Sequence, residues 1–138
     1  NNTNRKKISE KYKFQYQIAV HKTAAISVHS KIGEGTVVMA NVAVNPSVEI
    51  GKHCIINTGA VLEHDCKISD FAHISPNAAL AGNVEVGEGT HVGIGASVIQ
   101  GVKIGKWATI GAGAVVIKDV PDFAVVVGSP ARIIKYNN

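Results

Sequence analysis

The chain has 138 residues, a length typical of one domain, and a formal net charge of +4. It contains 19 Val and 16 Ile but only 2 Leu, and 5% of its residues are aromatic. Because β-branched residues favour strands and helical proteins rely on Leu, Ala, Glu and Lys, this composition excludes a helix bundle and predicts an all-β protein. The 46% of hydrophobic residues excludes a disordered chain, and no apolar run is long enough to cross a membrane as a helix.

The first residues of the chain are polar and mostly basic. One acidic residue, Glu10, stands among Arg5, Lys6, Lys7, Lys11 and Lys13. Because the sequence does not begin with Met, we interpret residues 1–19 as a linker or the end of a polar helix that belongs to an upstream segment. No basic stretch followed by an apolar segment marks a secretory signal, so we expect a cytoplasmic protein.

A period of six residues dominates the rest of the chain. From Val20 to Val116 every sixth residue is aliphatic, until Asp122 interrupts the series. The fourth residue after each aliphatic one is small, as at Ala60 and Ala78. Neither the period of a helix nor that of a long strand fits this pattern. Short strands joined by tight turns do fit it, with the aliphatic residues pointing inward.

Three such strands close one triangular coil of 18 residues, so residues 20–121 predict a parallel β-helix of about five to six coils. Residues 122–138 predict a short C-terminal cap, in which an extended strand crosses the open end of the prism and a Gly-Ser-Pro turn follows. Residues 18 apart lie one coil above each other on the same face. Cys54 and Cys66 fall on small inward positions, so we expect both thiols in the core.

One segment carries chemistry that the other hexads do not have. Residues 62–67 read Leu-Glu-His-Asp-Cys-Lys, and Gly82 lies one coil above His64. An imidazole acts as a general base near neutral pH, a neighbouring carboxylate orients it, and a glycine N–H can donate to a developing oxyanion. His64, Asp65 and Gly82 are therefore candidate catalytic residues for acyl transfer. The alternative is that His64 is only a solvated turn residue.

Two further histidines share a face with each other but not with His64. His73 and His91 are 18 residues apart, and His73 is nine residues, or half a coil, from His64. His73 can therefore face His64 only across the boundary between two copies of the chain. No two histidines are five residues apart, the spacing of the β-helix carbonic anhydrases, so we expect no metal site. No phosphate-binding loop, nucleophile elbow or basic aromatic nucleic-acid surface is present.

Four segments resemble the hexapeptide-repeat sugar acetyltransferases of the sialic acid O-acetyltransferase family: residues 57–66, 72–76, 80–84 and 127–132. The likeness covers about residues 18 to 135, and it is greatest to the N-acetyltransferases of nucleotide-linked 4-amino sugars, such as the UDP-4-amino sugars of the bacillosamine type. Many acyltransferases share the repeat, so the Glu-His-Asp-Cys segment and the Ala-Gly-Asn segment are the specific part. The resemblance implies that the β-helix is left-handed.

The resemblance also implies direct transfer from acetyl-CoA to the sugar, without an acyl-enzyme. His64 would be the general base that takes a proton from the sugar amine or hydroxyl. Asp65 would raise the basicity of His64, although many relatives have Glu there, which changes the hydrogen-bonding reach. Gly82 would donate its backbone N–H to the thioester oxygen.

For the cofactor, the family implies contacts from His73, Gly82, Ile94 and Ala112, and no metal. Its members form homotrimers with each site in the groove between two prisms, which agrees with the half-coil offset between His64 and His73. They also carry an N-terminal Rossmann-like domain that holds the nucleotide of the sugar. Residues 4–18 would match only the final helix and strand of that domain, so residues 1–19 are interpreted as its remnant or as a linker.

Three functions stay open from the sequence. The first is N-acetylation of a nucleotide-linked amino sugar by acetyl-CoA. The second is O-acetylation of a sialic acid or another surface-polysaccharide hydroxyl, because one imidazole base serves both acceptors. The third is a non-catalytic trimeric scaffold, which would have no reason to keep the Glu-His-Asp group of residues 63–65 opposite a glycine.

Overall fold

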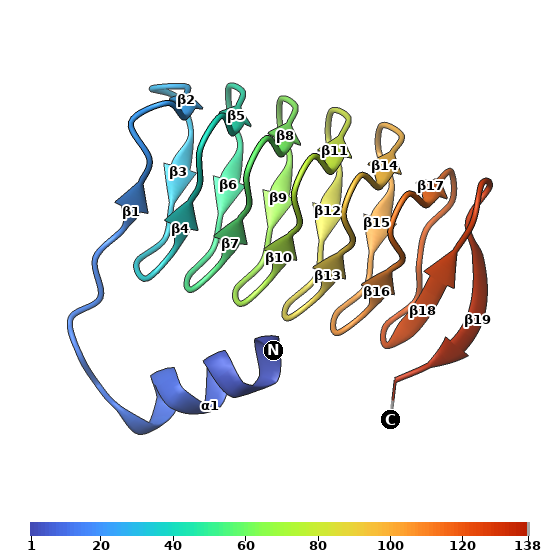
Figure 1. Cartoon of the computed structure of the whole chain (residues 1–138), viewed down its shortest axis with the longest axis horizontal. Coiled ribbons are helices and arrows are strands. Elements are labelled where there is room, and N and C mark those ends of the chain that lie inside the picture. Colours follow the sequence, from blue (N-terminus) through green and yellow to red (C-terminus); the bar gives the residue numbers. More distant parts are fainter. Residues whose placement is uncertain (138) are drawn as a thin grey trace.

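The computed structural model describes residues 1–137 as a β-helix with one short helix, α1 (Asn2–Lys11) (Figure 1). Most strands have two residues and alternate with four-residue turns. Sheet A contains β1 (Ala19–Val20), β4 (Val37–Val38), β7 (Ile55–Ile56), β10 (His73–Ile74), β13 (His91–Val92), β16 (Thr109–Ile110), β18 (Ala124–Val127) and β19 (Arg132–Tyr136). Sheet B contains β2 (Ala25–Ile26), β5 (Ala43–Val44), β8 (Val61–Leu62), β11 (Ala79–Leu80), β14 (Ser97–Val98) and β17 (Val115–Val116). Sheet C contains β3 (Lys31–Ile32), β6 (Glu49–Ile50), β9 (Lys67–Ile68), β12 (Glu85–Val86) and β15 (Lys103–Ile104).

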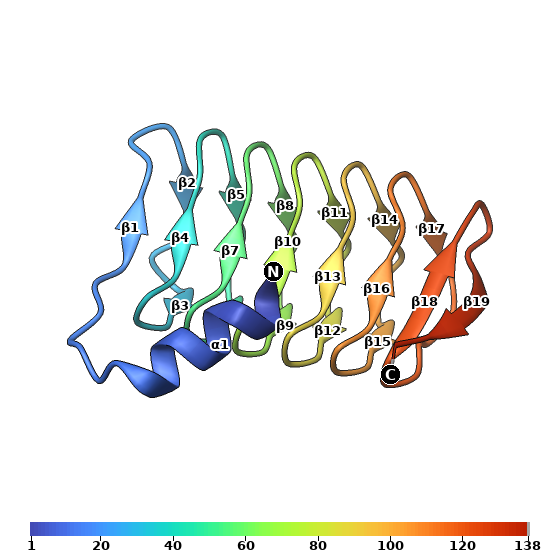
Figure 2. The same cartoon turned by 60° about the horizontal axis from the view of Figure 1, so that its bottom comes forward.

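The chain visits the three sheets in turn and returns to each of them after 18 residues. Neighbouring strands within each coil stack are parallel, and residues 18 apart pair directly, as His73 does with His91. In Figure 2 the strands of sheet A point upward on the near side, and the chain then passes over the top to sheet B and returns through sheet C. Because it advances to the right meanwhile, the coil is left-handed, and the predicted left-handed parallel β-helix is confirmed.

The aliphatic residues of the six-residue period fill the interior of the prism. Ile56 and Leu62 are fully buried, and small residues such as Cys54 pack beside them. This inward packing holds from Val38 onward. Val20 departs from the expectation and is 48% exposed, because within residues 1–137 no coil packs against the open side of the first one.

The turns between sheets form three corners, which we name after the sheets that they join. The AB corner includes residues 57–60, 75–78, 93–96 and 111–114. The BC corner includes residues 45–48, 63–66, 81–84 and 99–102. The CA corner includes residues 51–54, 69–72, 87–90, 105–108 and 121–123. These corners carry most of the exposed polar chemistry, since the strands between them have only one outward residue each.

The N-terminal segment packs along the CA corner. Helix α1 lies beside it, running back toward the first coil (Figure 2). The Arg5 guanidinium donates hydrogen bonds to the carbonyl oxygens of His53, at 2.7 Å, and of Ala72, at 3.2 Å. The expected helix in residues 4–18 is therefore present, but residues 12–18 form no strand. Among residues 1–137, no helix is long and apolar enough to cross a membrane.

The C-terminal cap is a pair of strands rather than a strand across the open end. β18 pairs in parallel with β16 and so extends sheet A, and β19 returns antiparallel to β18. The inward residues Ala124 and Val126 are buried and continue the core. The cap is thus confirmed, but its strand follows the sheet because the inward spacing of the repeat persists into β18.

Candidate active site

The BC corner holds the Glu-His-Asp segment singled out in the sequence. Nδ1 of His64 lies 2.8 Å from Oδ2 of Asp65. Because a carboxylate only accepts hydrogen bonds, Nδ1 carries the proton and the Nε2 lone pair is left to act as a base. Asp65 has a φ of 62°, in the left-handed region that Asp tolerates. The side chains of His64 and Asp65 are 63% and 57% exposed, so the base is open to a substrate.

Gly82 lies directly against the His64 ring, one coil further along the BC corner. A Cβ atom on Gly82 would be 2.5 Å from Cε1 and 2.6 Å from Nε2 of His64, far inside van der Waals contact. The position therefore requires glycine because of the close approach of the imidazole. The backbone N–H of Gly82 donates no hydrogen bond within residues 1–137. The three candidate catalytic residues are thus brought together.

His73 and His91 form a parallel stack on sheet A. Their ring centroids are 4.9 Å apart, with an angle of 3° between the ring planes. The Asn57 side-chain amide donates to Nε2 of His73 at 3.1 Å, and the Ser75 hydroxyl bonds Nε2 of His91 at 2.8 Å. Burial lowers the pKa of His73 to about 4, and the nearby His91 acts in the same direction. His73 is therefore neutral near physiological pH.

Asn57 and Ser75 are contacts that the sequence reasoning missed. Each lies 16 residues before its histidine, not 18, so the rule for stacked residues does not pair them. The pairing arises because a residue at the start of the AB corner can reach an outward side chain of the next strand of sheet A. A search for polar residues at this second offset would have found both.

Ile94 and Ala112 lie on the AB corner, one coil apart. Both side chains are exposed, and that of Ile94 is 53% exposed. The adjacent Gly95 and Gly113 have open space where a Cβ would be, so the backbone of this corner is accessible. In one copy of the chain this strip and His73 do not face His64, since sheet B separates the AB corner from the BC corner.

The cysteines and the acidic residues provide no second centre. Cys54 and Cys66 are buried, and burial raises the pKa of Cys54 to about 11 and also raises that of Cys66. Neither thiol is therefore a nucleophile near neutral pH. In the part of the chain that the structure describes, no three His, Cys, Asp or Glu side chains gather in a way that could hold a metal ion.

The repeat and the site together define a class of transferase. The family model of the bacterial transferase hexapeptide (six repeats) matches residues 29–64 and 85–118. The chain belongs to this hexapeptide transferase family. No curated protein sequence matches the chain significantly.

Solved structures place the chain closer to particular members. PerB from Caulobacter crescentus, solved in complex with CoA and GDP-perosamine, is 44% identical over 97% of this chain and 66% of its own, with a TM-score of 0.96. The acetyltransferase domain of PglB from Neisseria gonorrhoeae is 39% identical over 97% of this chain and 67% of its own, with a TM-score of 0.95. WeeI from Acinetobacter baumannii is 33% identical over 97% of this chain and 67% of its own, with a TM-score of 0.92. The chain thus spans about two thirds of the length of these proteins.

Proposed function

We propose that this chain transfers the acetyl group of acetyl-CoA to the amino group of a nucleotide-linked amino sugar. The observation that carries the proposal is the His64–Asp65 pair packed on Gly82 in an exposed corner. The likeness to PerB, solved with CoA and GDP-perosamine, supports both substrates, and the structure of the PglB domain in complex with acetyl coenzyme A supports the donor. Acetyl-CoA is a cytoplasmic metabolite, so we place the reaction in the cytoplasm.

In this mechanism His64 is the general base. Its Nε2 takes a proton from the sugar amine while the amine nitrogen bonds to the thioester carbonyl carbon. The Gly82 N–H donates to the carbonyl oxygen as negative charge develops there. The C–S bond then breaks, and the sulfur takes the proton held by His64, which leaves free CoA and the N-acetylated sugar. Asp65 keeps the imidazole in the correct tautomer and stabilises its protonated form.

The cofactor is proposed to lie along the uncharged strip formed by His73, Ile94 and Ala112. A neutral His73 can donate its Nδ1–H to an amide or carbonyl group of the cofactor, because Asn57 already occupies Nε2. Backbone N–H and C=O groups of the glycine-rich AB corner supply further partners. No metal is part of this mechanism, because the histidine and the amide N–H suffice for the proton and the developing charge.

We further propose a homotrimer in which each site lies between two prisms. The support is the separation of His64 from His73 within one copy, together with the surface of sheet B. Its outward residues are small and uncharged: Ala25, Ala43, Val61, Ala79, Ser97 and Val115. Such a flat face suits close packing against another copy. Residues 20–121 then carry catalysis, residues 122–138 cap the prism, and residues 1–19 link it to a nucleotide-binding domain.

The test is release of free CoA thiol from acetyl-CoA in the presence of defined acceptors. GDP-perosamine and a UDP-4-amino sugar should be acetylated, and the product should carry an amide. A matched acceptor with a hydroxyl in place of the amine should react at least about 100-fold more slowly. Preferred acetylation of a sialic acid hydroxyl would overturn the choice of amine, and thiol release with no acceptor tried would overturn the acceptor class.

A further inference from the structure

The CA corner differs from the other two corners in the residues that occupy its left-handed turn position. At the AB and BC corners that position holds Gly, Asn, Ser or Asp. At the CA corner it holds four aromatic residues with φ between 52° and 61°: His53, Phe71, Trp107 and Phe123. Bulky side chains are unfavourable in this region, so their concentration in one column points to a use for the rings.

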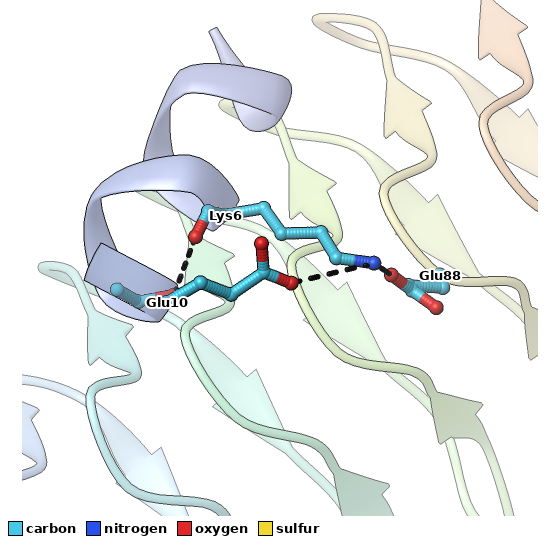
Figure 3. A network of polar contacts seen from close by, with 4 residues as sticks. Lys6, Glu10 and Glu88 are labelled. Atoms are coloured by element: carbon cyan, nitrogen blue, oxygen red, sulfur yellow. Dashed lines mark hydrogen bonds and ion pairs between the residues drawn. The ribbon is translucent and has the colours of Figure 1, made fainter. Parts of the chain in front are cut away.

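The first half of this aromatic column is already used by the N-terminal segment. His53 stacks on Phe71 with centroids 5.3 Å apart, and Tyr16 packs edge-on against His53. The Lys6 ammonium of α1 lies 5.7 Å from the ring centroids of Phe71 and Trp107 and pairs with Glu88 (Figure 3). These contacts explain two of the four rings, and they leave Trp107 and Phe123 beyond the end of α1.

Trp107 and Phe123 line a cleft of about 670 Å³ between α1 and the CA corner. Its other walls come from Thr3, Lys6, Glu88, Lys106 and Asn137. Lys6 is engaged by Glu88, whereas Lys106 reaches Asp122 only at 3.9 Å and its side chain is 53% exposed. Lys106 is therefore the cation that can turn toward a ligand in this cleft, and it already lies 6.0 Å from the Phe123 ring centroid.

The aromatic cleft is continuous with the cleft at the stacked histidines. A neighbouring cleft of about 490 Å³ is lined by His73 and His91, and it shares Thr3, Trp107 and Asn137 with the aromatic cleft. Phe123 precedes β18, which is three strands beyond β10 in sheet A, a distance of about 14 Å along the axis. A long ligand that contacts His73 therefore has a path to Trp107 and Phe123.

Charge also favours this path for a ligand that carries phosphates. The AB corner has no Lys or Arg between residues 39 and 114, and the outward residues of sheet A from β4 to β16 are Val37, Ile55, His73, His91 and Thr109. Phosphate groups along the proposed cofactor strip would therefore meet no cation there. On the CA side they would reach Lys106.

We propose that the adenosine 3′,5′-bisphosphate end of coenzyme A occupies this aromatic cleft, an inference that rests on the proposed function. The adenine lies against Trp107 and Phe123, and a phosphate group pairs with Lys106. The pantetheine arm then runs past His73 toward the His64 of the neighbouring copy. The left-handed rings are held in place by the fold so that adenine meets a preformed platform.

Fluorescence offers a direct test, because Trp107 is the single tryptophan of the chain. Titration with adenosine 3′,5′-bisphosphate, which has neither the thiol arm nor the acetyl group, should quench the emission in a saturable way. Lys106→Ala and Phe123→Ala should each weaken the binding of this fragment about tenfold or more, since each removes one charge-assisted or stacking contact. Lys135→Ala, which removes a lysine from β19 outside the cleft, is the matched control and should bind the fragment as the wild type does.

Kinetics should separate the nucleotide end from the reacting end. The ratio of kcat/KM for acetyl-CoA to that for acetyl-pantetheine should fall about tenfold in Lys106→Ala, because only the first donor carries the phosphates. Calorimetry that shows CoA binding with no change at Trp107, or weakening by Lys135→Ala alone, would overturn the cleft and leave the proposed function intact. Absence of any CoA binding by calorimetry would overturn both.

Discussion

Sheets B and C contribute equally to the core but present opposite outer surfaces. The outward residues of sheet C alternate in charge along the stack: Lys31, Glu49, Lys67, Glu85 and Lys103. Neighbours pair across strands, with Lys103 Nζ 3.4 Å from Glu85 Oε1. Sheet B presents Ala, Val and Ser at the equivalent positions. The inward residues define the coil, and the outward residues decide what each face can contact.

The difference indicates which face is hydrated and which is covered. A row of lysines and glutamates is costly to remove from water, so sheet C faces solvent. The uncharged sheet B has no such cost, and the His64 corner lies along its edge. The site is therefore expected at the boundary between copies, with sheet C on the outside. The predictions below test this division, in order of decreasing effect.

The largest effect is expected at the edge of sheet B, where the base lies. His64→Ala should lower kcat about 100-fold or more, as loss of a general base does. Gly82→Ala should have a comparable effect, because the added Cβ would be 2.5 Å from the His64 ring and would displace it. Gln100→Ala, one coil further along the same corner, is the matched control. Wild-type turnover in either of the first two variants would remove the base and its glycine from the mechanism.

Assembly should respond to sheet B and not to sheet C. Ala79→Arg places a charge in the middle of the uncharged face, and its desolvation should shift the protein from trimer to monomer in sedimentation. Lys67→Ala removes a charge from the next strand along the chain, in sheet C, and should leave the sedimentation unchanged. A wild-type oligomer for Ala79→Arg would show that sheet B is not the packing face.

The pH dependence of stability should report the buried state of His73 in sheet A. Its pKa is about 4 in the folded protein, against 6.5 ordinarily, so the unfolded chain binds more protons between these values. The stability from a neutral His73 is complete above about pH 6.5 and is lost as the pH falls toward about 4. Between about pH 6.5 and about pH 5, the free energy of unfolding should therefore fall more for the wild type than for His73→Asn. Equal slopes in urea unfolding would contradict this.

The smallest effect is expected in the charged ladder of sheet C. Glu85→Ala removes the partner of Lys103, but both side chains are substantially exposed. The free energy of unfolding should change by no more than about 0.5 kcal/mol, because water and salt screen such pairs. A loss several times larger in thermal or urea unfolding would mean that the ladder is buried in the assembly.

Much of this arrangement is encoded at a single sequence offset. The 18-residue repeat predicts the contact of His64 with Gly82 and the stack of His73 on His91, because a regular coil places such residues one above the other. It does not predict the hydrogen bond from Asn57 to His73, which depends on side-chain reach between neighbouring elements of successive coils.

The segments outside the repeat could be predicted only in part. The polar composition of residues 1–13 indicates a helix, but its docking through Arg5 to backbone carbonyls of two coils follows no sequence period. Likewise the cap was expected, whereas the extension of sheet A by β18 depends on pairing with β16. Period therefore fixes what stacks within the prism, and individual contacts fix what packs on it.

The most direct test of the shared site is a mixture of two inactive variants. His64→Ala removes the base but keeps the cofactor strip, and Ala112→Arg blocks the strip but keeps the base. If each site takes the base from one copy and the strip from the next, random mixed trimers should recover about a quarter of the wild-type rate of thiol release. A mixture that is no more active than either variant alone would contradict a site built between copies.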